Sequence, residues 1–134
     1  MPKEIKYPSV EQIVEYNLLA LSFIKAKKAD QAKILSRPRL DYIFGKCKEL
    51  EGDIYDKAAF LFINLIRLHH FASGNRRTAF IVTKDFLTEN GEKFKIEDSP
   101  SQAKIMVGVR ESYYTDDEIK EWIKNGQIKE FKRN

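Results

Sequence analysis

The residues best suited to chemistry stand between two strongly apolar stretches, in the sequence His69-His70-Phe71-Ala72-Ser73-Gly74-Asn75-Arg76-Arg77-Thr78. We expect His69 at the end of a buried helix, with one edge of its ring facing a loop. Gly74 lets the backbone turn tightly before a second helix, whose first N–H groups and positive dipole end form a site for an anion. Arg76 and Arg77 then add cationic donors suited to phosphate oxygens. A titratable base beside a phosphate cradle is the minimum equipment for transferring a phosphoryl-containing group to a hydroxyl.

The same residues allow other interpretations. A histidine beside an apolar helix is often a purely structural group. Helix, polar loop and basic helix also resemble a helix-turn-helix, with Arg76 and Arg77 on DNA phosphate or guanine. A metal site on His69 and His70 is disfavoured, because adjacent helical residues point about 100° apart and no third ligand stands at a chelating spacing. Spacing alone leaves catalysis, a structural role and nucleic-acid binding open.

Two helical patterns enclose the motif. Residues 54–69 are apolar nearly all round, and Asp53 stands where it can cap their first turn. A helix of that composition is normally surrounded by others, so we place it at the centre of a bundle. The helical pattern resumes over 76–89 and ends at Asn90-Gly91, which tolerates a left-handed backbone. The motif therefore joins the central helix to the next one.

Further elements complete an all-α prediction. Spacing and capping signals predict helices over about 9–28, over 40–50, after Ser99, and from Thr115 to Gly126. Residues 29–45, which contain the helix breaker Pro38, are interpreted as a loop or flap that leads into the 40–50 helix. The charged tail 127–134 is expected to fray. We predict five to seven helices in one domain, residues 1–134, with a core over about 9–125.

Composition excludes several classes of protein. The chain of 134 residues is 43% hydrophobic and 12% aromatic, which excludes a disordered chain. Its longest apolar run, residues 58–63, is far shorter than the about 20 residues needed to cross a bilayer. The net charge is +4 and both signs are interleaved, as on solvated helices, which argues against a nucleic-acid partner. With Cys47 as the only cysteine and no apolar signal segment, we expect a cytoplasmic protein.

The motif His69-x-Phe71-x-x-Gly74-Asn75-Arg76-Arg77 resembles the signature of the Fic/Doc family, His-x-Phe-x-(Asp/Glu)-(Gly/Ala)-Asn-x-Arg. The basic residue before the last arginine, followed by Thr78-Ala79, is closer to the death-on-curing (Doc) branch. Further segments are similar to the end of the family's flap, the start of its central helix and the closing helix of Doc-like chains: Leu35 to Pro38, Asp53 to Ala59 and Thr115 to Trp122. The resemblance therefore covers about 9–125.

This resemblance implies a compact helical bundle of the Fic/Doc type with a short flap, and ATP and a protein as the two substrates. His69 would be the general base that accepts the proton of the attacking hydroxyl. Gly74 and Asn75 would shape the anion-binding nest, with the Asn75 side chain orienting phosphate. Arg77 would neutralise the charge that builds on phosphate in the transition state. His70 lies at a variable position of the signature and receives no catalytic role.

Two departures from the adenylylating relatives indicate the reaction. Arg76 stands where those enzymes have glycine, and Phe80 stands where they have a second arginine. A large cation in the loop occupies the space of an incoming α-phosphate and offers its own contact to a terminal phosphate. Both departures favour a Doc-like toxin that phosphorylates a Ser or Thr hydroxyl of a protein such as a translation elongation factor. Nucleotidyl (AMP) transfer is the alternative, and a small antitoxin would inhibit such a toxin in trans through a helix laid in a groove.

A third departure concerns the metal. Ser73 occupies the position of the acid that holds Mg²⁺ in the family, and a serine hydroxyl is a weak, neutral ligand. Asp85 cannot replace that acid, because ten helical residues beyond Asn75 correspond to about 15 Å. We therefore assign no protein residue to a metal: Mg²⁺ would be held mainly by phosphates and water, or another acid would reach the site, or turnover would be impaired. The remaining alternative is a degenerate scaffold that binds a nucleotide or a partner without turnover.

Overall fold

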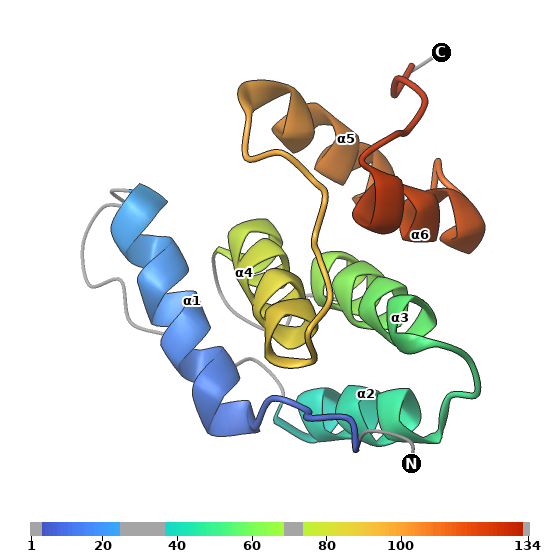
Figure 1. Cartoon of the computed structure of the whole chain (residues 1–134). Coiled ribbons are helices and arrows are strands. Elements are labelled where there is room, and N and C mark those ends of the chain that lie inside the picture. The colour runs from blue at the N-terminus through green and yellow to red at the C-terminus, as the bar shows by residue number, and fades with distance from the viewer. Residues whose placement is uncertain (1–3, 25–36, 69–73, 133–134) are drawn as a thin grey trace.

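Six helices make up most of the computed structural model. It describes residues 4–24, 37–68 and 74–132, of which residues 21–24 are described by their backbone alone. The helices are α1 (Val10–Ile24), α2 (Arg37–Glu49), α3 (Ile54–Arg67), α4 (Asn75–Glu89), α5 (Pro100–Arg110) and α6 (Asp116–Asn125) (Figure 1). These described residues contain no strand, so the all-α prediction is confirmed. Within the same ranges, every helix is too short or too polar to span a membrane.

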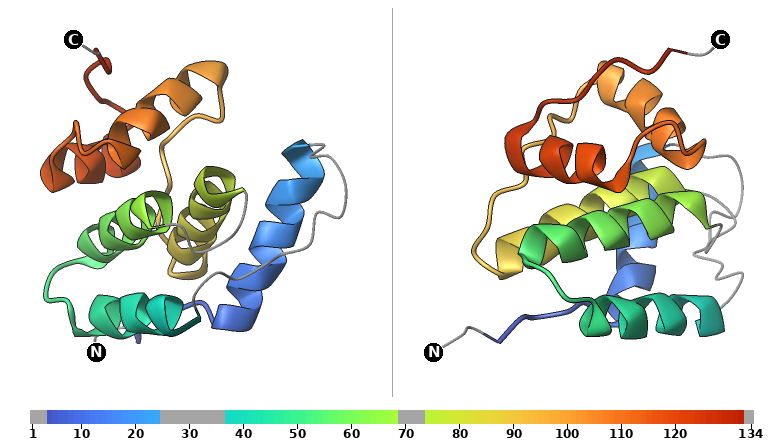
Figure 2. Two further views of the ribbon diagram at one scale, coloured as in Figure 1. Left: turned by 180° about the vertical axis from the view of Figure 1, so that it is seen from behind. Right: turned by 90° about the vertical axis from the view of Figure 1, so that its right-hand side faces the viewer.

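Helix α3 lies at the centre of the fold, as its all-round apolar pattern predicts. It contacts α2, α4, α5 and α6, whereas α1 packs on α4. Figure 2 shows the resulting tiers, with α5 and α6 on one side of the α3–α4 pair and α2 on the other. The core is built from buried aliphatic and aromatic side chains, among which Phe62 of α3 and Phe86 of α4 are nearly inaccessible. The motif therefore stands where the chain passes from α3 to α4, two helices that contribute many buried side chains to the core.

A capping box starts α3 and ties it to α6. The Asp53 carboxylate accepts the N–H of Asp56 at 2.9 Å, and the Asp56 carboxylate accepts the N–H of Asp53 at 2.8 Å. Both carboxylates sit at the positive end of the helix dipole, where negative charge is favoured. The ammonium of Lys120, on α6, lies 2.8 Å from Asp56 Oδ1. The pair therefore fixes the start of the central helix against the last one.

A buried lysine closes the C-terminal end of α2. Lys57, on α3, is 5% exposed, and its Nζ donates to the carbonyl oxygens of Cys47 at 2.7 Å, Lys48 at 3.3 Å and Leu50 at 2.8 Å. The last carbonyls of a helix have no partner within the helix and carry the negative end of its dipole. One ammonium group contacts two of these helical carbonyls and the carbonyl of Leu50 just after the helix, which explains how a charged side chain is tolerated inside the core.

The predicted flap is partly wrong. The helix predicted over 40–50 starts earlier than expected: Arg37 begins α2, and Pro38 lies in its first turn, where the missing N–H of proline has no helical partner to lose. The rest of the predicted flap, 29–36, lies outside the described residues, as does the end of the 9–28 helix beyond Ile24.

The C-terminal segment is a second correction. Residues 127–132 do not fray: Phe131 is 6% exposed, and the hydroxyl of Tyr114 donates to the carbonyl oxygen of Lys129 at 2.9 Å. The ring of Phe131 lies 5.0 Å from that of Tyr113, edge to face. The many charged residues of this segment predict exposure to solvent. The buried side chain of Phe131 nevertheless packs the segment against α5 and α6.

Candidate anion-binding site

The first turn of α4 carries four of the predicted site residues. Gly74 is the N-cap, with φ 76° and ψ 17°, a left-handed conformation that glycine adopts without the penalty of a Cβ atom. The helix then begins at Asn75, and the N–H of Thr78 donates to the carbonyl oxygen of Gly74 at 2.9 Å. Gly74 has no side chain to cap the helix, and the N-terminus of a helix is a place where the backbone favours an anion.

These four residues line one pocket together with part of α5. The pocket has a volume of about 420 Å³ and is lined by Gly74, Asn75, Arg76, Arg77, Gln102, Ala103 and Met106. Its wall therefore contains two guanidinium groups and two carboxamides from helices that are distant in sequence. The arrangement is the one expected of a site for a phosphate-bearing ligand.

Arg77 is held by a carboxylate from the α4–α5 linker. Its Nη1 lies 2.8 Å from Asp98 Oδ1 and its Nη2 lies 3.0 Å from Asp98 Oδ2, a bidentate pair. The hydrogen bonds from Arg77 lower the pKa of Asp98, and the same bonds raise the pKa of Arg77. The Arg77 side chain is 28% exposed, so the fork stays within reach of solvent while it binds the Asp98 carboxylate.

The Arg77 guanidinium group packs over the ring of Phe80. The guanidinium carbon of Arg77 lies 5.4 Å from the centre of the Phe80 ring, within the range of a cation–π contact. Phe80 itself is 4% exposed and packs edge to face on Phe94 at 5.1 Å. Position 80 is therefore a core position here and offers no second cation to the pocket.

Helix α1 fixes the orientation of α4. The Asn17 amide donates to the hydroxyl of Thr78 at 3.0 Å, and both residues are almost fully buried. Two turns further along, the hydroxyl of Tyr16 donates to the carboxylate of Asp85. Burial, followed by this bond to Asp85, raises the pKa of Tyr16. Asp85 is therefore engaged with α1, in agreement with its exclusion as a ligand of the site.

The predicted base lies outside the described part of the chain. His69, His70, Phe71 and Ser73 fall in residues 69–73, so the pairing of the His69 imidazole with this pocket stays a prediction. The structure brings together the other half of the motif, from Gly74 to Arg77, which the sequence assigned to phosphate binding.

Sequence analysis missed the residues that complete the pocket. Asp98 directly precedes Ser99-Pro100 and looks like part of a helix start, and no local signal indicates an arginine partner 21 residues earlier. Gln102 and Met106 are one helical turn apart and form the α5 wall. Gln102 gives a partial signal, because it is a polar residue on the apolar side of its helix and is 7% exposed.

The described residues do not suit a metal ion. No residue that lines the pocket carries a carboxylate, and Asp98, the acid beside it, is paired with Arg77. Across the described ranges no three His, Cys, Asp or Glu side chains gather as metal ligands would. Because Mg²⁺ is normally held by at least one carboxylate, we derive no step through the metal.

Comparison with known proteins identifies the family. The sequence profile of the Fic/DOC family matches residues 6–87, more than half of the chain, from the N-terminal segment through most of α4. A search of curated proteins finds no match. The family is helical and generally transfers nucleotidyl or phosphoryl groups from ATP to proteins, in keeping with an all-α fold and a cationic pocket at the motif helix. The chain therefore belongs to the Fic/DOC family.

Proposed function

We propose that the chain is a Doc-like protein kinase, the toxin of a toxin–antitoxin pair. It transfers the γ-phosphoryl group of ATP to a Ser or Thr hydroxyl of a protein such as a translation elongation factor. The observation that carries the proposal is the pocket in which the α4 first turn, from Gly74 to Arg77, meets α5. Family membership supports group transfer to a protein, and the pocket supports the phosphate.

The reaction needs few parts. His69 accepts the proton of the attacking hydroxyl, whose oxygen forms a bond to the γ-phosphorus while the bond to the β–γ bridging oxygen breaks and ADP leaves. The first-turn N–H groups and the Arg77 fork stabilise the charge on the transferred group. Arg77 must exchange its Asp98 partner for phosphate oxygens, which are acceptors of similar geometry.

Two residues favour phosphoryl over nucleotidyl transfer. Arg76 is exposed and lines the pocket, so a second cation stands next to Arg77 at the mouth of the anion site. Phe80 is buried in the core and supplies no further contact along a longer chain of phosphates. Cationic donors are therefore concentrated at one place, which suits a single terminal phosphate.

One observation supports a second candidate. The described residues that line the pocket include no carboxylate, and Ser73 stands at the position of the family's metal-binding acid. A scaffold that binds ATP or a partner without turnover would need no such acid. Restoring it with Ser73→Asp is expected to raise activity if the chain is a weak kinase, and to create activity where the wild type has none if it is a scaffold.

The test uses ATP labelled at two positions. The purified chain is incubated with a cell extract and either γ-³²P-ATP or α-³²P-ATP, and labelled proteins are separated and counted. We expect label from γ-³²P only, with a loss of about 100-fold or more in His69→Ala. His70→Ala is the matched control and should label like the wild type.

Other outcomes have definite meanings. Label from α-³²P-ATP indicates nucleotidyl transfer. No label from either, with ATP binding retained in calorimetry, indicates the scaffold. Equal labelling by His69→Ala and the wild type removes the proposed base.

The antitoxin proposal has its own test. A short reading frame next to the gene should encode a protein that copurifies with the chain and suppresses both labelling and growth arrest. Growth arrest that persists when this protein is present in excess contradicts the toxin–antitoxin assignment.

A further inference from the structure

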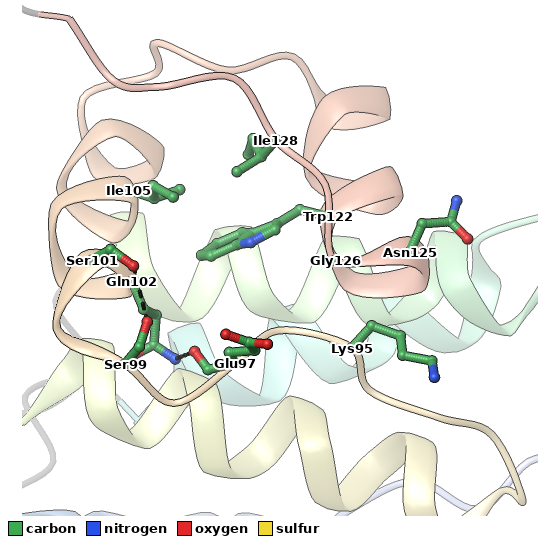
Figure 3. A pocket seen from close by; sticks show the side chains of 10 residues that line it. All are labelled: Lys95, Glu97, Ser99, Ser101, Gln102, Ile105, Trp122, Asn125, Gly126 and Ile128. Atoms are coloured by element: carbon green, nitrogen blue, oxygen red, sulfur yellow. Dashed lines mark hydrogen bonds between the residues drawn. The ribbon is translucent and has the colours of Figure 1, made fainter.

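A second pocket lies on another side of α5, between the α4–α5 linker and α6 (Figure 3). Its volume is about 420 Å³, and Trp122, Ile105, Ile128 and Glu97 are among the residues that line it. It shares only Gln102 with the pocket at Arg77. The two hollows are therefore neighbours, and the described motif residues, Gly74 to Arg77, do not line the second one.

Trp122 offers this pocket a hydrogen-bond donor. The residue is 4% exposed, and its ring packs edge to face on Phe62 at 5.9 Å. Its indole nitrogen lies on the ring edge that faces Glu97 (Figure 3), and no described residue accepts a hydrogen bond from it. An indole N–H can only donate, and a buried tryptophan usually has an acceptor. The pocket therefore contains a fixed donor that a ligand can satisfy.

Glu97 offers an acceptor in the same space. Its carboxylate forms no ion pair or side-chain hydrogen bond with the described residues, and Figure 3 shows it below the Trp122 ring. Its backbone is fixed, because its carbonyl oxygen accepts the N–H of Ser99 at 3.0 Å and the Gln102 amide at 3.2 Å. The position of this acceptor is therefore set by the linker and not by the loose end of a loop.

The remaining wall is partly apolar. Ile105 of α5 and Ile128, after α6, are half-buried and lie above the Trp122 ring in Figure 3. A ligand for this pocket must accept from an indole N–H, donate to a carboxylate and bring an apolar group. A phosphate anion is disfavoured by the negative charge of the Glu97 carboxylate, and an ammonium ion cannot accept a hydrogen bond.

We propose that this pocket binds a peptide segment of another protein. A backbone carbonyl of the segment accepts from Trp122 Nε1, a backbone N–H donates to Glu97, and an apolar side chain packs against Ile105 and Ile128. A peptide carries these three features with the donor and acceptor on opposite edges of the same chain. Because Gln102 lines both pockets, such a segment lies next to the anion site. The role of holding the polypeptide substrate rests on the proposed kinase, whereas the binding itself does not.

The test uses the single tryptophan of the chain as a reporter. The full chain is labelled with ¹⁵N and titrated with N-acetyl-leucine N-methylamide, while the one indole ¹H–¹⁵N signal is followed. We expect a saturable shift with a Kd of about 1 mM, the order expected for a ligand of this size. Glu97→Ala should raise this Kd about tenfold, because a hydrogen bond to a charged group is lost. Glu92→Ala, an exposed glutamate of the same linker, is the matched control and should leave it unchanged.

Three results would overturn the proposal. They are an indole signal that does not respond to the peptide, a response that is the same in Glu97→Ala, and an indole signal that responds to ATP instead. The last would assign the pocket to a nucleoside, whose base edge also carries a donor and an acceptor. ATP is expected to shift the backbone signals of Gly74 to Arg77 whether or not the peptide binds, so failure of the kinase proposal and failure of this one are distinguishable.

Discussion

The Asp98 carboxylate binds Arg77, the residue that we expect to bind phosphate. The contact is bidentate, but Asp98 is 51% exposed, so it can leave at little cost. We expect Asp98→Asn to lower the Kd for ATP about two- to fivefold in calorimetry, because the phosphate no longer competes with a carboxylate. Asp117→Asn, an exposed residue at the start of α6, changes the net charge equally and should have no such effect. Weaker binding by Asp98→Asn would mean that Asp98 positions Arg77 instead of shielding it.

Cys47 predicts a pH dependence of stability. The thiol is fully buried and donates to the carbonyl oxygen of Lys57, and burial raises its pKa to about 11. The unfolded thiol has a pKa of about 8.5, so the unfolded state releases its proton first as the pH rises. The contribution of the neutral thiol is fully present below pH about 8.5 and is lost as the pH approaches the folded value.

The measurement is urea unfolding at pH 8 and pH 10 for the wild type and Cys47→Ala. The variant should be less stable at pH 8 but lose less stability between the two values, with a difference of up to about 1.4 kcal/mol per pH unit. Parallel losses in the two proteins would show that the thiol does not control this range.

At the residue scale, the sequence predicts what depends on near neighbours. The first turn of α4 places Gly74 to Arg77 together because they are consecutive, and all four residues line one pocket. Asp98 and Gln102 could not be predicted, since their position depends on how α5 packs. His69 stays a prediction.

At the scale of elements, starts are more predictable than connections. Ser9, Asp53 and Thr115 each accept the N–H three residues along, because an N-terminal cap is a local hydrogen bond. The position of Pro38 is ambiguous for a physical reason. A proline that ends one helix is equally compatible with the first turn of the next, and only the packing of Leu40 and Ile43 into the core distinguishes the two.

Two glycines in helix interiors give a matched pair of substitutions. Gly45 of α2 is exposed, and a Cβ atom there would have no neighbour within 4 Å, whereas at Gly108 of α5 it would lie 2.6 Å from Tyr114 Cε2. We expect Gly45→Ala to stabilise the chain by about 0.5–1 kcal/mol, because alanine is the better helix former. Gly108→Ala should destabilise it by about 1–3 kcal/mol through overpacking. Urea unfolding of both variants checks the opposite signs, and equal shifts would refute the close approach at Gly108.

At the scale of the whole molecule, the last described segment closes the α5–α6 side of the fold. Phe131 is buried against Tyr113 and Tyr114, so Phe131→Ala should lower the free energy of unfolding by about 3 kcal/mol. Tyr42→Ala is the control: its side chain is 64% exposed on α2, and the change should stay within about 0.5 kcal/mol. Thermal unfolding compares the two, and a small effect of Phe131→Ala would restore the expectation of a frayed tail.

The all-α architecture around α3 could be predicted from the sequence, but the packing of the surrounding helices and of residues 127–132 could not. An all-round apolar helix must be enclosed whatever surrounds it, so α3 is central in both the prediction and the structure. Which helix covers which face depends on contacts between distant segments, and composition hides a segment such as 127–132, where one aromatic residue outweighs its charged neighbours.

The reactivity of the buried Lys57 ammonium reports whether the end of α2 is still packed against α3. An acylating reagent will modify the exposed lysines of every folded molecule, but it can reach this nitrogen only after the end of α2 has separated from α3. The fraction of molecules acetylated at this one position, read by peptide mass spectrometry, therefore counts the chains in which that joint has opened.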